Sequence, residues 1–216
     1  MKTTRTVAAF VLVVAVAMPT SAQTSDPSIS IRPFAMGSLE WFTAKKTFDA
    51  VFGKSSQLLL GGGLEVATAK GWYLDVAVSR FKKTGERVFV SNGTTFHFAQ
   101  PISVTATLMP LEATAGYRFH VGSNGRLRPY VGAGVGSYAY KQESPGDDPG
   151  EKVDVRHTGF LVAGGAQYRI QRWVSVSADA QYTSISGILG AGGVSQQVNE
   201  KDLGGIAARF RILIGK

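Results

Sequence analysis

Histidine is the side chain best suited to acid–base chemistry near neutral pH, and the chain contains three: His97, His120 and His157. They lie in separate segments, and no serine stands two residues from a histidine on an expected strand. Three scattered histidines are also a poor metal site. Asp147 and Asp148 invite a calcium hypothesis, but their segment lacks the spaced oxygen ligands of an EF-hand loop. These patterns favour a protein that is not an enzyme and that binds no metal ion or cofactor.

A second set of charged residues lies on the polar faces of stretches in which apolar and polar residues alternate. Its members are Arg32, Glu65, Asp75, Glu112, Asp179, Arg209 and Arg211. Glu65 and Asp75 stand at matching heights on neighbouring stretches, where like charges repel, and unpaired charge is costly to bury. We expect Arg32, Arg211, Glu65 and Asp75 to form one layer and Glu112, Asp179 and Arg209 a second. The chemistry expected of this set is mutual neutralisation, which would plug an enclosed interior.

The elements that must position these charges read as β-strands. The clearest is 173–183, in which five apolar residues alternate with polar ones and no helical period fits. Seven more stretches repeat the pattern: 29–41, 57–68, 72–83, 102–119, 127–141, 158–169 and 203–215. The apolar residues of 102–119 change phase after Met109-Pro110, which predicts a β-bulge at the proline and an outward, apolar face for Val104, Ala106 and Leu108. Segment 43–56 predicts a loop with a short helix, and Asn92-Gly93 predicts a small hairpin.

Eight strands in succession, joined alternately by long and short connections, suffice to close an up-and-down barrel. The N-terminal segment indicates where such a barrel resides. Lys2 and Arg5 precede an apolar run of 12 residues, and small residues follow before Gln23. This is the pattern of a secretory signal peptide over residues 1–22. Residues 23–216 then form the mature domain, whose formal charge falls from +8 to +6. With no cysteine in the chain, disulfides cannot stabilise the exported protein.

Two classes of eight-stranded barrel remain open: a secreted, lipocalin-like carrier with an apolar interior, and an outer-membrane barrel with an apolar exterior. Small residues lie mostly on the polar face, which suits a narrow lumen. Aromatic residues form two groups that resemble interfacial girdles. The group near the short turns is Trp72, Tyr117, Phe119, Tyr168 and Trp173, and the group near the long loops is Trp41, Tyr138, Tyr140 and Tyr182. These features favour the fold class all-β, eight-stranded antiparallel up-and-down transmembrane β-barrel.

Basic residues gather where the second and third strands reach the long-loop end. They are Lys54, Arg80, Lys82, Lys83 and Arg87. We expect this rim to bind lipid phosphates, although a solvated charged rim would read the same way. A nucleic-acid partner is not expected of an exported chain without a clustered basic stripe.

The stretch Leu127-Arg128-Pro129-Tyr130-Val131 through Gly136 resembles a strand of small bacterial outer-membrane β-barrel proteins, the OmpA/OmpW-like group, and Glu112 to Phe119 resembles the strand before it. The resemblance implies a Gram-negative cell envelope, outer-membrane lipids, including lipopolysaccharide, as partners, delivery by the outer-membrane assembly machinery, and a monomer. The C-terminal sequence Ile214-Gly215-Lys216 departs from the terminal aromatic residue that many such proteins carry. A structural or surface-interaction role is the first expectation, and a narrow, porin-like channel for small solutes is the alternative.

Overall fold

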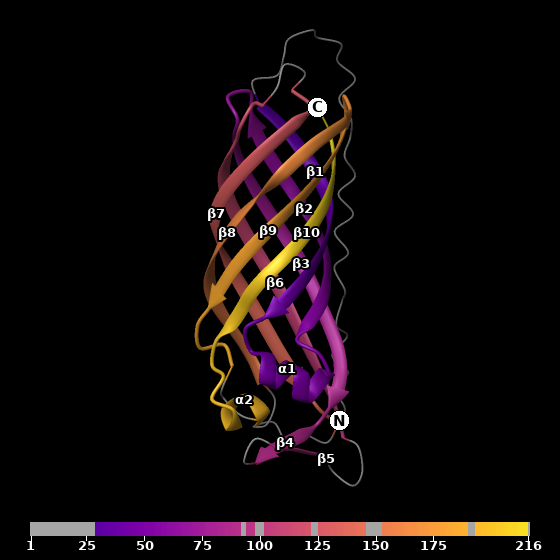
Figure 1. The fold of residues 1–216 in the computed structure, drawn as a ribbon, viewed down its shortest axis with the longest axis vertical. Coiled ribbons are helices and arrows are strands. Elements are labelled where there is room, and N and C mark those ends of the chain that lie inside the picture. Colours follow the sequence, from indigo (N-terminus) through magenta and orange to yellow (C-terminus); the bar gives the residue numbers. More distant parts are fainter. Residues whose placement is uncertain are drawn as a thin grey trace, which may run out of the picture.

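The chain folds into a closed antiparallel β-barrel of eight strands (Figure 1). The computed structural model describes residues 29–91, 94–97, 102–121, 125–145, 153–189 and 193–215. Each barrel strand pairs with the next along the chain, and the last pairs back on the first. The strands are β1 (Ile29–Phe42), β2 (Ser56–Thr68), β3 (Trp72–Glu86), β6 (Ser103–Arg118), β7 (Leu127–Glu143), β8 (Val153–Gln171), β9 (Val174–Ile185) and β10 (Leu203–Ile214). The predicted fold class is confirmed.

Four smaller elements lie at the long-loop end (Figure 1). The helix α1 (Lys45–Phe52) joins β1 to β2, and α2 (Gly193–Gln197) lies between β9 and β10. Strands β4 (Val88–Ser91) and β5 (Thr94–His97) form the predicted hairpin. The Asn92-Gly93 turn, the expected signal peptide with its boundary before Gln23, and Asp147-Asp148 lie outside the described residues.

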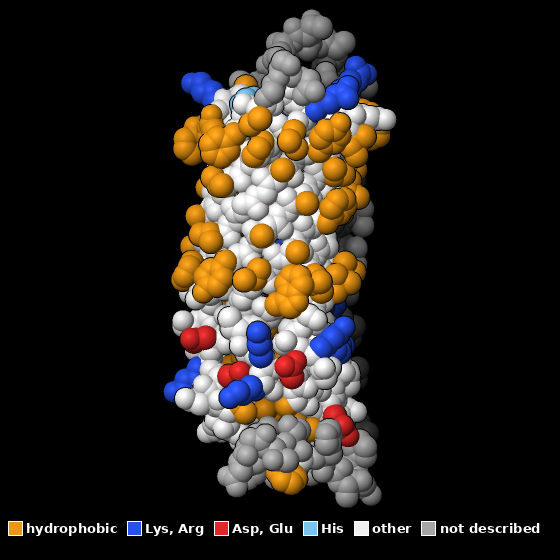
Figure 2. Space-filling model, viewed as in Figure 1, with side chains coloured by type: hydrophobic (Ala, Val, Ile, Leu, Met, Phe, Trp, Pro, Cys, Tyr) orange, Lys and Arg blue, Asp and Glu red, His pale blue; other side chains and the backbone are white. Residues whose placement is uncertain are grey.

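Alternation along each strand separates a lipid-facing exterior from a polar interior. On β3, Leu74, Val76 and Val78 are exposed on the outside, whereas Asp75 between them is buried inside. On the face drawn in Figure 2, hydrophobic side chains are concentrated in two belts with smaller ones between them, and charged groups lie beyond each belt. This is the pattern of a barrel that crosses a bilayer. In such barrels the short turns face the periplasm and the long loops face the cell exterior, and the two ends are named accordingly.

The two belts contain most of the expected aromatic residues. In the periplasmic belt, Tyr117 stacks edge-on against both Trp72 and Phe119, with ring centroids 5.3 Å apart in each case. Exposed Tyr168 and Trp173 complete this belt, and the extracellular belt contains exposed Trp41, Tyr182 and Phe160. The assignment of Tyr138 and Tyr140 to the outer girdle was wrong. Both are buried inside the barrel, because they share the inward face of β7 with its alternate glycines.

Four adjacent strands are longer than a bilayer requires. A spanning strand needs about 9–11 residues, whereas β3, β6, β7 and β8 contain 15, 16, 17 and 19 residues. They form a wall that continues past the extracellular belt. Strands β9 and β10, with 12 residues each, end closer to that belt. Beyond the extracellular belt the outer surface of the wall faces water. Apolar residues are therefore favoured on its inner surface in this region.

This reversal of polarity explains the phase change near Pro110, and the predicted β-bulge there was wrong. The register between β3 and β6 is the same on both sides of the proline: Val78 pairs with Leu111 and Phe81 with Leu108. Even-numbered residues of β6 face inward throughout. Val104, Ala106 and Leu108 therefore lie inside the wall and do not contact lipid, contrary to expectation.

The interior of the wall is filled by an apolar cluster that we call the extracellular cap. Phe48 of α1 is fully buried in it and stacks on Phe42 at 4.4 Å between ring centroids. The cap consists of Phe42, Ala44, Phe48, Leu59, Phe81, Ala106, Leu108, Tyr138, Tyr140, Ile185, Ile188, Leu189 and Leu203. These residues come from seven of the barrel strands, all except β8, from the loop that contains α1 and from the chain that leads into α2. The two loop segments therefore close the mouth against the wall.

Candidate functional site

Between the extracellular cap and the periplasmic end, the lumen contains a continuous network of charged and polar side chains. At its periplasmic end, Glu65 is fully buried and receives the guanidinium groups of both Arg32 and Arg118. The register places Arg32 of β1 directly beside Glu65 of β2, while Arg118 reaches across from β6. Arg32 also donates to Gln167 Oε1 at 3.3 Å. Arg118 lies 4.7 Å from the ring centroid of Tyr73, a cation–π contact.

The middle of the network is organised by Arg211, which is 3% exposed. Its Nη1 donates to Asp75 Oδ2 at 2.6 Å, its Nε donates to Ser177 Oγ at 3.0 Å, and its Nη2 donates to the Tyr130 hydroxyl at 2.7 Å. The Tyr130 hydroxyl in turn donates to Asp179 Oδ2 at 2.5 Å. The rings of Phe34 and Tyr130 each lie 5.3 Å from the guanidinium carbon. Arg211 thus joins strands from both sides of the barrel.

The layer nearest the cap is built on Arg209 and Glu112. Arg209 Nε donates to Asp179 Oδ1 at 2.6 Å, and its Nη1 lies 3.9 Å from Glu112 Oε2. Glu112 also accepts bonds from the Tyr138 hydroxyl at 2.8 Å and from Gln181 Nε2 at 3.1 Å. Because Tyr138 belongs to the cap, the ionic network and the apolar cap meet at this hydroxyl.

The structure places all seven sequence-selected charges inside the barrel, each at most 8% exposed. Their grouping differs from two separate layers, because Asp179 contacts Arg209 at 2.6 Å and Arg211 at 3.6 Å and so links them. The like charges Glu65 and Asp75 are direct cross-strand neighbours, as expected. Glu65 pairs with Arg32 and Arg118, and Asp75 pairs with Arg211.

Sequence reasoning missed Arg118, Tyr130 and several amide side chains of the network. Arg118 shares the inward, even-numbered face of β6 with Glu112, so the alternation that selected Glu112 could also have selected Arg118. Tyr130 shares the inward face of β7 with Gly132 and Gly134, and its role could have been found from that alternation. Gln167 and Gln181 need knowledge of which strands lie opposite, which no local pattern contains.

The extracellular cap is held by charge as well as by packing. The helix α1 has no side-chain cap of its own at Ala44, and Glu200 supplies one from the loop after α2. Its carboxylate accepts from the backbone N–H of Lys46 at 3.2 Å and of Thr47 at 2.9 Å, and from the Thr47 hydroxyl at 2.7 Å. A carboxylate is favourable at the positive end of a helix. Glu200 therefore fastens one loop of the cap to the other.

The opposite end of α1 is held by Lys83. Its Nζ donates to the Phe52 carbonyl at 3.1 Å and lies 5.7 Å from the Phe52 ring centroid. Desolvation, and then the neighbouring charge of Lys54, lower the pKa of Lys83. A cation is favourable at the negative end of a helix. Lys83 therefore stabilises α1 and points away from the surrounding lipid.

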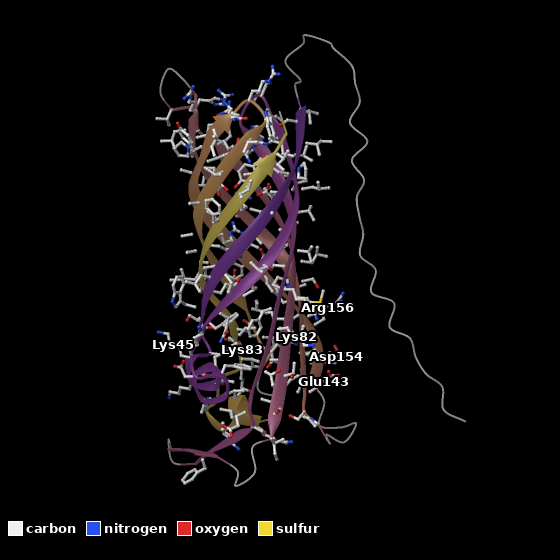
Figure 3. All side chains as sticks on the ribbon, turned by 90° about the vertical axis from the view of Figure 1, so that its right-hand side faces the viewer. Lys45, Lys82, Lys83, Glu143, Asp154 and Arg156 are labelled. Atoms are coloured by element: carbon white, nitrogen blue, oxygen red, sulfur yellow. The ribbon has the colours of Figure 1, made fainter. Side chains whose placement is uncertain are left out.

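The other residues of the expected basic rim are more accessible. Lys54, Arg80 and Lys82 are exposed, and Arg87 is partly exposed. Figure 3 shows Lys82 on the same side of the wall as Arg156, Asp154 and Glu143. The structure therefore adds acidic residues to a rim that the sequence suggested to be basic.

The histidines lie apart. His120 is exposed at the periplasmic end, His97 is the last residue of β5, and His157 Nδ1 lies 3.1 Å from the Ser186 carbonyl near the extracellular cap. Within the described ranges, no group of three or more histidines and carboxylates is placed to hold a metal ion. Neither of the described helices is long and apolar enough to cross a membrane.

Comparison with known proteins gives one family match. Residues 8–204 match the family described as outer membrane protein beta-barrel domain, and no curated protein matches the chain. Among solved structures, Neisserial surface protein A is 15% identical with a TM-score of 0.49, over 86% of this chain and 96% of that one. The N-terminal β-barrel domain of Pseudomonas aeruginosa OprF is 16% identical with a TM-score of 0.45, over 87% and 97%. Ail of Yersinia pestis is 13% identical with a TM-score of 0.46, over 87% and 97%.

The family match spans most of the chain and includes strands on every side of the barrel. It agrees with the closed barrel and with the lipid-facing exterior between two aromatic belts. This protein therefore belongs to the outer membrane protein beta-barrel domain family.

Proposed function

We propose that this protein is a sealed, non-catalytic outer-membrane barrel that acts in envelope structure or surface interaction. The observation that carries the proposal is the presence of two closures in series, the ionic network around Arg211 and the extracellular cap around Phe48. An interior of eight strands is just wide enough for side chains to fill. A pore needs a continuous aqueous path, so two successive closures favour a scaffold over the alternative of a narrow channel. Export through residues 1–22 and a monomeric state belong to the same proposal.

The surface available for interaction is the outer face of the wall. The register aligns Lys82 of β3, Thr107 of β6, Lys141 of β7 and Asp154 of β8 in one row beyond the extracellular belt. Arg80 and Arg156 face outward one position nearer the membrane on the same wall. Arg80, Lys82 and Arg156 are the cations that we propose to contact lipopolysaccharide phosphates.

This contact with lipopolysaccharide can be tested by binding at increasing salt. Replacing Arg80 and Lys82 with serine should weaken binding to lipopolysaccharide vesicles and reduce its salt dependence, since surface charges are screened within about 10 Å at 0.1 M salt. Lys83→Ser is the matched control, because this lysine is engaged with α1. If Arg80→Ser/Lys82→Ser binds with the same affinity and salt dependence as the unaltered protein, the basic rim has no role in lipid binding.

The two closures can be tested separately in proteoliposomes that contain a small trapped dye. The double variant Arg211→Ala/Asp75→Ala removes an ion pair without leaving its partner charged, and Phe48→Ser weakens the cap. We expect neither change alone to release dye and the combination of both to release it. Lys141→Ala/Glu143→Ala removes a surface ion pair of 3.2 Å and serves as the control for charge loss.

Rapid dye release from the unaltered barrel, equal to that of the combined variant, would favour the channel and reject the sealed scaffold. Release by either single closure variant would show that the two closures are not in series.

A further inference from the structure

The periplasmic end of the barrel is basic in a way that the extracellular end is not. The three short turns and the strand ends beside them contain Lys70, Arg126, Arg128, Arg169 and Arg172, and the sequence from 68 to 72, 119 to 128 and 168 to 174 contains no aspartate or glutamate. The extracellular end mixes both signs, with Asp49, Glu86, Glu143, Asp154, Glu200 and Asp202 among its basic residues. The sequences of the three periplasmic turns therefore contain basic residues and no carboxylate.

These cations lie beside the periplasmic aromatic belt. Tyr168 directly precedes Arg169, and Trp173 directly follows Arg172. Tyrosine and tryptophan of such belts sit at the level of the lipid headgroups. Arg126, Arg169 and Arg172 are exposed, and a backbone bond of 2.9 Å from Arg169 N–H to the Arg126 carbonyl joins two of the turns. The exposed guanidinium groups therefore lie beside the aromatic belt, on turns that a backbone hydrogen bond joins.

Arg128 and the lumen residue Arg118 each have an unused donor at this end. The Nε atoms of Arg118 and Arg128 are buried and have no hydrogen-bond partner among the described residues. In the adjacent lumen, Arg32 and Arg118 share the single carboxylate of Glu65. Positive charge therefore exceeds negative charge where the lumen opens to the periplasm, which adds to the attraction for an anion.

We propose that the periplasmic end is a binding surface for anionic phospholipid headgroups of the inner leaflet, with Arg126, Arg169 and Arg172 contacting their phosphates. The charges stand next to exposed aromatic rings that contact acyl chains, and this combination fits a lipid better than a soluble anion or a peptidoglycan carboxylate. The surface would fix the depth and orientation of the barrel in the membrane. It lies at the opposite end from the proposed lipopolysaccharide contacts and does not depend on them.

The three tryptophans provide reporters for both ends. Trp72 and Trp173 lie in the periplasmic belt and Trp41 in the extracellular one. A barrel with Trp41→Phe and Trp72→Phe retains only Trp173, and one with Trp72→Phe and Trp173→Phe retains only Trp41. Each is reconstituted in phosphatidylcholine vesicles that contain brominated phosphatidylglycerol or brominated phosphatidylcholine, and the ratio of fluorescence quenching gives the lipid preference at that end. Inorganic phosphate and soluble peptidoglycan fragments are added as competitors.

We expect phosphatidylglycerol to be enriched at Trp173 and not at Trp41. Since each cation near an anionic surface contributes about fivefold to relative affinity, replacing Arg126, Arg169 and Arg172 with serine should lower the enrichment by up to about 100-fold. Replacing all three with lysine should preserve it, which shows that charge and an intact fold suffice. Equal preference at both tryptophans, or enrichment that survives the serine changes, would overturn the proposal. Loss of enrichment with peptidoglycan fragments, but not with phosphate at equal ionic strength, would assign the surface to peptidoglycan instead.

Discussion

Replacing Arg211 with methionine tests whether the lumen network stabilises the barrel through charge pairing. Arg211 is 3% exposed and contacts Asp75 at 2.6 Å, whereas Asp75 Oδ1 already lacks a partner among the described residues. Removing one partner of a buried ion pair costs about 3–5 kcal/mol, because the other charge stays buried and unpaired. Asp179 keeps Arg209 at 2.6 Å, so the uncompensated charge is that of Asp75. We therefore expect Arg211→Met to lower the free energy of unfolding by about 3–5 kcal/mol.

The double variant Arg211→Met/Asp75→Asn separates lost charge pairing from lost packing. Neutralising both partners should recover most of the loss, because no uncompensated charge then stays buried. The assay is denaturant unfolding of the barrel in lipid vesicles, followed by tryptophan fluorescence. Lys141→Met is the matched control: its ion pair with Glu143 is about half exposed, so it should cost less than about 1 kcal/mol. A single variant as stable as the unaltered barrel, or a double variant no more stable than the single, would refute the reasoning.

Three further changes address the cap, the exterior and the lumen wall. Glu200→Gln should lower stability by about 1 kcal/mol through the weaker cap of α1, and hydrogen exchange of the α1 amides should rise while that of β9 does not. Val76→Arg should lower the free energy of unfolding in vesicles by about 2–4 kcal/mol. Thr158→Arg, exposed beyond Phe160, should be near neutral, and equal costs for the two variants would contradict a bilayer that lies between the two belts. Gly63→Ala should fold poorly, because the added Cβ would lie 2.0 Å from the Val76 carbonyl oxygen, and unaltered folding yield would contradict that contact.

Alternation made the strands predictable, since a period of two assigns each residue to one of two faces. The pairing of Glu65 with Asp75 followed from counting back from one short turn, where few residues separate the strands. Local patterns of this kind supplied all eight strands and placed the seven charges on one face.

The alternation of apolar and polar residues does not show whether the outer surface of a strand faces lipid or water. The inward residues of β6 are apolar at Leu108 and charged at Glu112, because the wall leaves the bilayer between them. When all apolar residues of β6 were assumed to face lipid, this switch from apolar to charged inward residues resembled a bulge at Pro110. The assumption placed Val104 on the wrong face. The cap was also missed, because Tyr138 was assigned to a girdle by its residue type although it shares a face of β7 with Gly134 and Gly136.

The central claim, that the lumen is sealed, is tested most directly by conductance of the unaltered barrel in planar bilayers. Two closures in series predict a baseline without a steady open level, at either polarity. Opening should appear only when the Arg211–Asp75 pair and Phe48 are both removed. A large, steady conductance from the unaltered protein would contradict the account.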